Sequence, residues 1–157
     1  MKYRRPNEGV VELSEPAATV ISRQRQLNST ASEAGGMLLG RLINGSDDVI
    51  IDEVTEPASS DRRGRLFFMR SKKHAQQHVN SAWEESERTR NYLGEWHTHP
   101  EDDPVPSTQD LYNWRRIATV AQYEQDYLFF IIVGRNKTRI WELHKVRGTL
   151  AELPLLS

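Results

Sequence analysis

Hydrophobic positions along the chain follow two kinds of pattern, short continuous runs and helical spacings, which predict a protein of mixed α and β structure. The continuous runs have the length of strands and are separated by polar or turn-forming residues. They predict strands at 10–13, 37–43, 49–54, 66–69, 92–96, 127–133 and 138–143. The run at 127–133 is apolar throughout, which is typical of a strand that is covered on both faces.

Three other segments have apolar residues spaced by three and four, as in a helix with one buried face. The first spans 14–27, with Ser14 placed to cap it and Pro16 in its first turn. The second spans 71–86 and has only a narrow apolar stripe on an otherwise charged surface. The third spans 107–123 and begins directly after a proline-rich loop, in which regular structure is not expected.

Turn-forming residues connect some of the predicted strands. Asn44 and Gly45 form a strong turn signal between two apolar runs, so we predict a β-hairpin over 37–55. A second turn at 134–136 predicts a hairpin made by the last two long runs. The segment 57–65 is polar and contains serine, glycine and proline, and we predict a loop there.

These elements predict an α+β or α/β sandwich with about six strands and three helices. The chain has 157 residues, which is enough for one domain with a single hydrophobic core. It contains no internal repeat, low-complexity tract or long linker. We therefore predict that residues 1–157 form a single domain.

Composition excludes several classes of protein. The chain has no cysteine, so it has no disulfide framework, thiolate nucleophile or cysteine-based zinc site. Its 21 basic and 22 acidic residues are balanced, which does not favour bulk nucleic-acid binding. No apolar run approaches the roughly 18 residues that span a bilayer, and no signal-peptide pattern follows Met1. We expect a cytoplasmic protein whose metal ligands, if any, are histidines and carboxylates.

The segment 97–110 carries the strongest chemical signal. His97 and His99 are two residues apart at the end of a predicted strand, so their side chains point to the same side and can reach one ion. Asp110 lies in the first turn of the next predicted helix and can complete a set of two nitrogen ligands and one oxygen ligand. Three protein ligands leave the fourth position of a tetrahedral Zn²⁺ open, as in catalytic sites.

Hydrolysis at such a site also needs a general base and a donor for the developing oxyanion. Ser107 is a candidate donor, although it could also simply cap the helix that contains Asp110. Glu33 is a candidate base because the two glycines that follow it allow another backbone to approach closely. Spacing does not decide this assignment, since four acidic residues are nearer in sequence to the histidines: Glu95, Glu101, Asp102 and Asp103.

The set Glu33, His97, His99, Ser107 and Asp110 resembles the signature of the JAMM (JAB, MPN+) metalloproteases at every specified position. The resemblance implies the JAMM/MPN (cytidine-deaminase-like) fold, a curved mixed β-sheet flanked by helices. It also implies a zinc isopeptidase that removes ubiquitin or a ubiquitin-like protein. The two histidines and the aspartate would bind zinc, the glutamate would act as base, and the serine would help to hold the tetrahedral intermediate.

The sequence GEWHTHPE at 94–101, the small size and the Pro106-Ser107 entry to the helix are similar to the bacterial JAB proteases of CBASS antiphage operons. That resemblance implies that the protein deconjugates a CD-NTase, the nucleotidyltransferase that makes the signalling nucleotide, from target lysines. The functional partner would be an E1–E2 fusion protein that makes the conjugate. Two alternatives stay open: a protease that processes a ubiquitin-like sulfur carrier, and a non-catalytic MPN scaffold module.

Other candidate features have less specific explanations. A basic cluster is either solvated surface or a docking site for an acidic partner or nucleic acid, and it comprises Arg62, Arg63, Arg65, Arg70, Lys72 and Lys73. The histidines at 74 and 78 are four residues apart on a predicted helix, but no third ligand accompanies them, so we expect them at the surface. We expect all four tryptophans to lie in the core: Trp83, Trp96, Trp114 and Trp141.

Overall fold

The computed structural model describes residues 1–156, so Ser157, the last residue of the predicted domain, lies outside the described range. Within this range the chain forms three helices: α1 (Glu15–Arg23), α2 (Lys72–Glu85) and α3 (Thr108–Val120). It also forms ten strands: β1 (Lys2–Arg4), β2 (Val10–Leu13), β3 (Gly35–Leu42), β4 (Val49–Val54), β5 (Arg62–Gly64), β6 (Phe67–Met69), β7 (Asn91–Thr98), β8 (Tyr127–Val133), β9 (Thr138–His144) and β10 (Leu150–Glu152).

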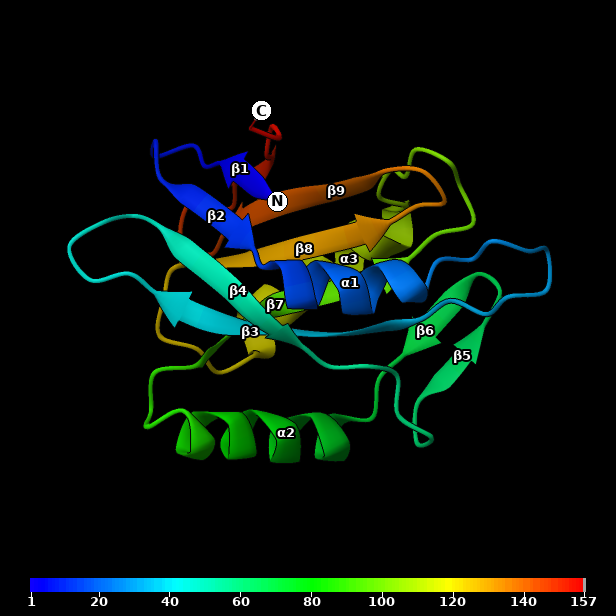
Figure 1. Cartoon of the computed structure of the whole chain (residues 1–157), viewed down its shortest axis with the longest axis horizontal. Coiled ribbons are helices and arrows are strands. Elements are labelled where there is room, and N and C mark those ends of the chain that lie inside the picture. Colours follow the sequence, from blue (N-terminus) through cyan, green and yellow to red (C-terminus); the bar gives the residue numbers. More distant parts are fainter. Residues whose placement is uncertain (157) are drawn as a thin grey trace.

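Eight strands form one mixed sheet in the order β1-β2-β4-β3-β7-β8-β9-β10 (Figure 1). The pairs β2/β4 and β7/β8 are parallel, and the other neighbours are antiparallel. The remaining two strands, β5 and β6, form a small separate hairpin to one side. The predicted hairpins β3/β4 and β8/β9 are both present, and the prediction of a mixed sheet flanked by helices is confirmed.

The sheet curls until its two ends meet. The chain that follows β10 runs beside β1, where Tyr3 and Leu155 form an isolated antiparallel bridge. On either side of the bridge, the Arg4 amide donates to the Pro154 carbonyl at 2.9 Å and the Leu156 amide donates to the Lys2 carbonyl at 2.8 Å. The outer edge of β1 is therefore covered by the chain that follows β10, which limits unwanted pairing with other chains.

The helices cover opposite faces of the curled sheet. Ala17 and Ile21 of α1 join a core that includes Phe129, Ile131 and Val133. On the other face, α3 packs on the alternate residues of β8, with this set of side chains: Trp114, Ala118, Leu128, Phe130 and Ile132. The alternation explains why the run 127–133 is apolar throughout, since both of its faces are buried.

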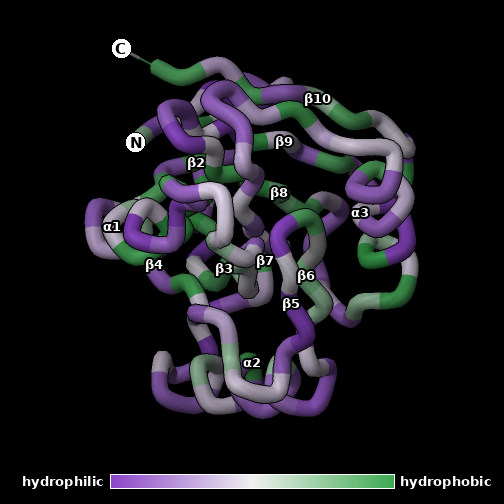
Figure 2. Tube along the Cα trace, turned by 90° about the vertical axis from the view of Figure 1, so that its right-hand side faces the viewer, coloured by the Kyte–Doolittle hydropathy of each residue, from purple (hydrophilic) through white to green (hydrophobic). Residues whose placement is uncertain are grey.

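Helix α2 lies apart from the main body, across β3 and β7, and its trace is mostly hydrophilic (Figure 2). Only Ala75 and Ala82 are buried on this helix. The expectation that Trp83 belongs to the core is wrong, because its residue is 37% exposed, whereas the other three tryptophans are buried. The buried face of this helix is so narrow that it consists of two alanines, and the neighbouring Trp83 ring lies at the surface.

Several boundaries differ from the prediction. Helix α1 ends at Arg23 rather than at residue 27, and the chain continues into a turn and loop. Strand β5 lies within the segment 57–65 that we expected to be a loop. Strands β1 and β10 are not predicted, because their three-residue sequences KYR and LAE are not apolar runs, unlike FFM of β6. Among the residues that the structure describes, no helix is long and apolar enough to cross a membrane.

Candidate active site

Two histidines lie at the C-terminal end of strand β7, in the middle of the sheet. Its neighbours β3 and β8 pair with it on both sides, and His97 is in register with Gly35 and Ile132. His99 comes directly after the strand, where its amide donates to the Val133 carbonyl at 3.0 Å. Because side chains alternate along a strand, the two imidazoles lie on the same side, and their Nε2 atoms are 3.0 Å apart.

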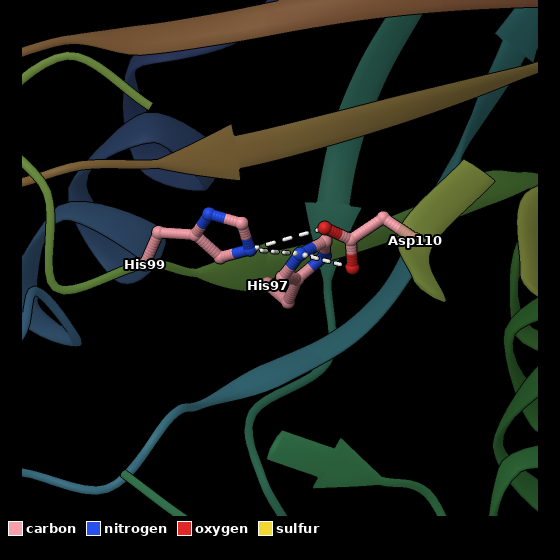
Figure 3. A group of neighbouring side chains, drawn as sticks. All are labelled: His97, His99 and Asp110. Atoms are coloured by element: carbon pink, nitrogen blue, oxygen red, sulfur yellow. Dashed lines mark hydrogen bonds and ion pairs between the residues drawn. The ribbon is translucent and has the colours of Figure 1, made fainter. Parts of the chain in front are cut away.

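Asp110 reaches the two histidines from the first turn of α3 (Figure 3). Its Oδ1 lies 3.1 Å from Nε2 of His97, and its Oδ2 lies 3.2 Å from Nε2 of His99. One ligand atom from each of the three residues lies within 4.8 Å of the others. This is the only such group of three or more histidine and carboxylate side chains within residues 1–156. Two imidazole nitrogens and one carboxylate oxygen are a donor set that suits zinc.

Ser107 is the N-cap of α3 and forms a capping box with Asp110. The Ser107 hydroxyl accepts from the Asp110 amide at 3.1 Å, and the Ser107 amide and hydroxyl both donate to Oδ2 of Asp110 at 2.7 Å. The cap fixes the carboxylate and so orients its oxygens towards the histidines. The capping role is therefore present, and the predicted role of Ser107 as an oxyanion donor stays a prediction.

Glu33 lies just before β3, and its residue is only 6% exposed. The pairing of Gly35 with His97 places the Glu33 segment beside the two histidines. A Cβ atom at Gly36 would lie 2.1 Å from the Thr55 carbonyl oxygen, so the expected close approach of backbones at the paired glycines is present. Burial raises the pKa of Glu33 from 4.5 to about 7, with an opposing effect of His99 and a further increase from Asp110.

The electrostatics of the cluster favour a positive charge at its centre. Burial by itself would raise the pKa of Asp110, but hydrogen bonds from His97, His99 and Ser107 lower it well below its usual range. Burial would lower the pKa of His99, but its hydrogen bond to Asp110 and the nearby charges of Asp110 and Glu33 raise it overall. The aspartate is thus an anion at neutral pH, and the site stabilises cations.

The loop between β7 and α3 is held against the β8/β9 turn. The Asp102 carbonyl accepts from the amides of Asn136 and Lys137 at 3.1 and 3.0 Å. Asp103 pairs with Lys137 and Arg139, and these hydrogen bonds lower its pKa. The Asp102 carboxylate pairs with Arg135 at 2.9 Å, so the carboxylates of both aspartates, which competed with Glu33 for the role of base, are in ion pairs with the β8/β9 turn and β9.

Of the other two competing acids, Glu95 is paired away from the histidines, whereas Glu101 lies beside His99 but is exposed, unlike Glu33. Glu95 pairs with Arg70, so one member of the predicted basic cluster is engaged in an ion pair. Oε2 of Glu101 lies 3.7 Å from Nδ1 of His99, and the side chain is half exposed. His78, which we expected at the surface, is 2.9 Å from Glu53 and is partly exposed.

The family of the chain follows from its sequence as a whole. Residues 14–144 match the family described as prokaryotic homologs of the JAB domain, and this span contains every element from α1 to β9. The chain belongs to this prokaryotic JAB family. The resemblance inferred from the five motif residues is therefore confirmed.

Relatives within the JAB family carry a consistent name. The chain is 35% identical to a protein of Vibrio cholerae over 134 residues, which cover 85% of this chain and 82% of that protein. It is 35% identical to an Escherichia coli protein over 133 residues and 34% identical to a Pseudomonas aeruginosa protein over 130 residues. These cover 85% and 83% of this chain and 80% of each relative. All three are named CD-NTase/cGAS isopeptidase.

A solved structure has a similar fold. The solution structure of a Desulfitobacterium hafniense protein matches with a TM-score of 0.60 and 19% identity. The match covers 90% of this chain and 88% of that protein. At this level of identity the likeness concerns the fold alone.

Two polar residues beside the site had no distinctive sequence signal. Thr98 lies between the two histidines and is completely buried, on the opposite face of β7. Gln26 is 1% exposed and hydrogen-bonds to Thr98. Strand alternation could have placed the threonine inside, but nothing in the sequence distinguishes this glutamine from its exposed neighbours.

Proposed function

We propose that this JAB-family protein is a zinc-dependent isopeptidase that cleaves the bond after the C-terminal residue of a conjugated protein. The observation that carries the proposal is the convergence of His97, His99 and Asp110, with the buried carboxyl group of Glu33 beside them. Such a site combines a cation-binding centre with a group that can exchange protons near neutral pH. We propose further that residues 1–157 form one catalytic domain.

The three converging side chains fit zinc. His97 and His99 would hold it through Nε2 and Asp110 through a carboxylate oxygen, since these atoms face one another. Bound zinc supplies Lewis acidity, which polarises a carbonyl group and lowers the pKa of water. Ser107 contributes by fixing the aspartate through two hydrogen bonds at 2.7 Å.

Glu33 would transfer the proton during hydrolysis. A water molecule adds to the carbonyl carbon of the isopeptide bond while Glu33 takes a proton from it. The bond between carbon and nitrogen then breaks, and Glu33 returns the proton to the departing lysine amine. Burial raises the pKa of Glu33 above that of an exposed carboxyl group, which makes it a better proton acceptor than the solvated acids of the loop. Ser107 would donate a hydrogen bond to the developing oxyanion, which requires its hydroxyl to turn away from Asp110.

We propose a CD-NTase tail as the substrate, on the basis of the relatives named CD-NTase/cGAS isopeptidase. The enzyme would then deconjugate the CD-NTase from its targets in CBASS antiphage defence, opposing an E1–E2 fusion protein. The tail of a ubiquitin-like sulfur carrier is the alternative substrate, because the bond cleaved is chemically the same. A non-catalytic MPN module is less well supported, since the motif residues are all present and the base is buried beside the cluster.

The test is cleavage of a fusion in which a CD-NTase C-terminus is joined to a reporter protein. We expect cutting directly after the tail, inhibition by a chelator and recovery with Zn²⁺. Glu33→Gln should bind zinc normally but cleave at least about 100-fold more slowly, because it cannot accept a proton. Cleavage by Glu33→Gln at the wild-type rate would contradict the assignment of the base. A zinc-loaded protein that cuts a sulfur-carrier fusion but not the CD-NTase fusion would contradict the assignment of the substrate.

A further inference from the structure

Gln26 is a buried polar side chain that connects three segments of the chain. Its Nε2 donates to the Ala31 carbonyl and to the Arg65 carbonyl, both at 2.9 Å. Its Oε1 accepts from the Thr98 hydroxyl at 3.0 Å. Both amide hydrogens and one oxygen lone pair are thus used, which is the condition under which a buried amide stabilises one arrangement of its surroundings.

Thr98 also hydrogen-bonds to the segment that contains Glu33, so it links this segment to Gln26. The Thr98 hydroxyl accepts from the Ala34 amide at 2.9 Å, and the Thr98 amide donates to the Ala34 carbonyl at 2.9 Å. The residue after Glu33 is therefore held on both of its backbone groups by the residue that lies between His97 and His99. A shift of this segment would move the Glu33 carboxylate relative to both histidines.

The β5/β6 hairpin holds the same segment from the other side. The Gly64 carbonyl accepts from the Glu33 amide at 2.6 Å, and the neighbouring Arg65 carbonyl accepts from Gln26. Residues 31–34 are thus bound between β7 and the hairpin, and Gln26 bonds to both sides. Loss of its side chain would leave the Arg65 and Ala31 carbonyls without these donors.

We propose that Gln26 is a positioning residue for the reaction, which holds Glu33 at its working distance from the histidines through Thr98, Ala31 and the β5/β6 hairpin. This inference rests on the proposed function for its effect on rate. Its structural part, the restraint on residues 31–34, is independent of any substrate. A misplacement of about 1 Å can cost about 100-fold in rate, so a lost restraint is measurable even when the protein still folds.

The experiment compares Gln26→Leu with Gln24→Leu in the zinc-loaded protein. Gln24→Leu is the control, because it makes the same chemical change two residues away. The Gln24 side chain makes only a surface hydrogen bond, to Glu56 at 3.0 Å. In a second pair, Thr98→Val removes the hydroxyl at nearly the same volume, and Thr98→Ser keeps the hydroxyl but removes a methyl group. Three quantities are measured for each protein: zinc per chain, kcat and KM on the fusion substrate, and amide exchange of residues 31–36 by mass spectrometry.

We expect Gln26→Leu and Thr98→Val to keep one zinc per chain and a KM within about threefold, while kcat falls by about 10- to 100-fold. Amide exchange over 31–36 should rise by about 10-fold or more, with exchange over 128–133 unchanged. Gln24→Leu should match the wild type, and Thr98→Ser should recover most of kcat. A merely structural role would instead change exchange over 128–133 and zinc content together.

Unchanged exchange over 31–36 in Gln26→Leu overturns the proposal, whatever the activity. An unchanged kcat in Gln26→Leu overturns it as well, whether or not Thr98→Val is slower. If Gln26→Leu fails to fold, the Thr98 pair decides, and equal kcat values for Val and Ser contradict the positioning role. A wild-type protein that cleaves no fusion refutes the proposed function instead, and the exchange measurement alone then decides whether Gln26 restrains the Glu33 segment.

Discussion

Replacing Glu33 by glutamine should stabilise the metal-free protein at alkaline pH. The Glu33 carboxyl group is buried, and its pKa is raised from 4.5 to about 7. The ionised form is therefore less stable in the folded protein than in the unfolded chain. Glutamine has nearly the same size but no charge, so it removes this penalty. A residue suited to accept protons would thus reduce stability at the pH at which it works.

The size and sign of the effect follow from the two pKa values. Because the folded pKa lies above the unfolded one, the contribution of Glu33 to stability is complete below pH 4.5 and is lost as the pH rises to 7. The loss at pH 8 corresponds to about 3 kcal/mol, and at pH 5 it is still below about 1 kcal/mol. The stability gained by Glu33→Gln should therefore be about 2 to 3 kcal/mol larger at pH 8 than at pH 5.

The assay is urea unfolding of wild type and Glu33→Gln at both pH values after removal of metal with a chelator. Metal must be removed because a nearby cation favours the ionised carboxylate and would oppose the effect. Glu84→Gln makes the same change at an exposed position and is the control. A difference between the two pH values below about 0.5 kcal/mol, or of the opposite sign, would refute the argument that Glu33 is buried with a raised pKa.

Other predictions concern catalysis, the metal and the core. In the zinc-loaded protein, kcat/KM should fall about tenfold per pH unit below the pKa of Glu33, which bound zinc lowers from its metal-free value, because only ionised Glu33 accepts a proton; the same acid-side fall in the residual activity of Glu33→Gln would contradict this. Asp110→Ala should lose zinc in metal analysis and about 1 kcal/mol in urea unfolding through its lost cap, and retention of one zinc per chain would exclude it as a ligand. Gly94 has a φ of 138°, and a Cβ there would lie 1.8 Å from the Phe129 carbonyl oxygen, so Gly94→Ala should lower stability by at least about 2 kcal/mol in the same assay. Trp114→Ala removes a buried ring stacked on β8 and should cost about 3 to 5 kcal/mol; a melting temperature close to that of the wild type would contradict its place in the core.

The long elements were predictable because their patterns are local. The run 127–133 is a strand that is buried on both faces, and Asn44 with Gly45 does connect an antiparallel pair. The short strands at the two ends of the sheet were missed, since their stability depends on partners that are distant in sequence. Helix α1 stops at Arg23 although the chain beyond it carries no strong stop signal, and Gln26 is used outside the helix to bond to Thr98.

The candidate ligands were visible in the sequence, because two histidines on alternate positions share one side of a strand end and the aspartate lies in the first turn of the next helix. The choice of Glu33 among several carboxylates was not determined by spacing. It depends on the pairing of β3 with β7, which brings residues 64 positions apart into contact, as the 2.9 Å bond between Ala34 and Thr98 shows.

Local periodicity by itself determined the main strands and helices, because it depends on side-chain direction within a few residues. The identities of the motif residues determined the family and the candidate ligands. Only the tertiary structure decided which carboxylate is buried beside the histidines, which acids hold the loop, and that Gln26 connects three segments. Burial, pKa and hydrogen-bond partners are properties of groups brought together from distant parts of the chain, and they do not exist until the sheet has assembled.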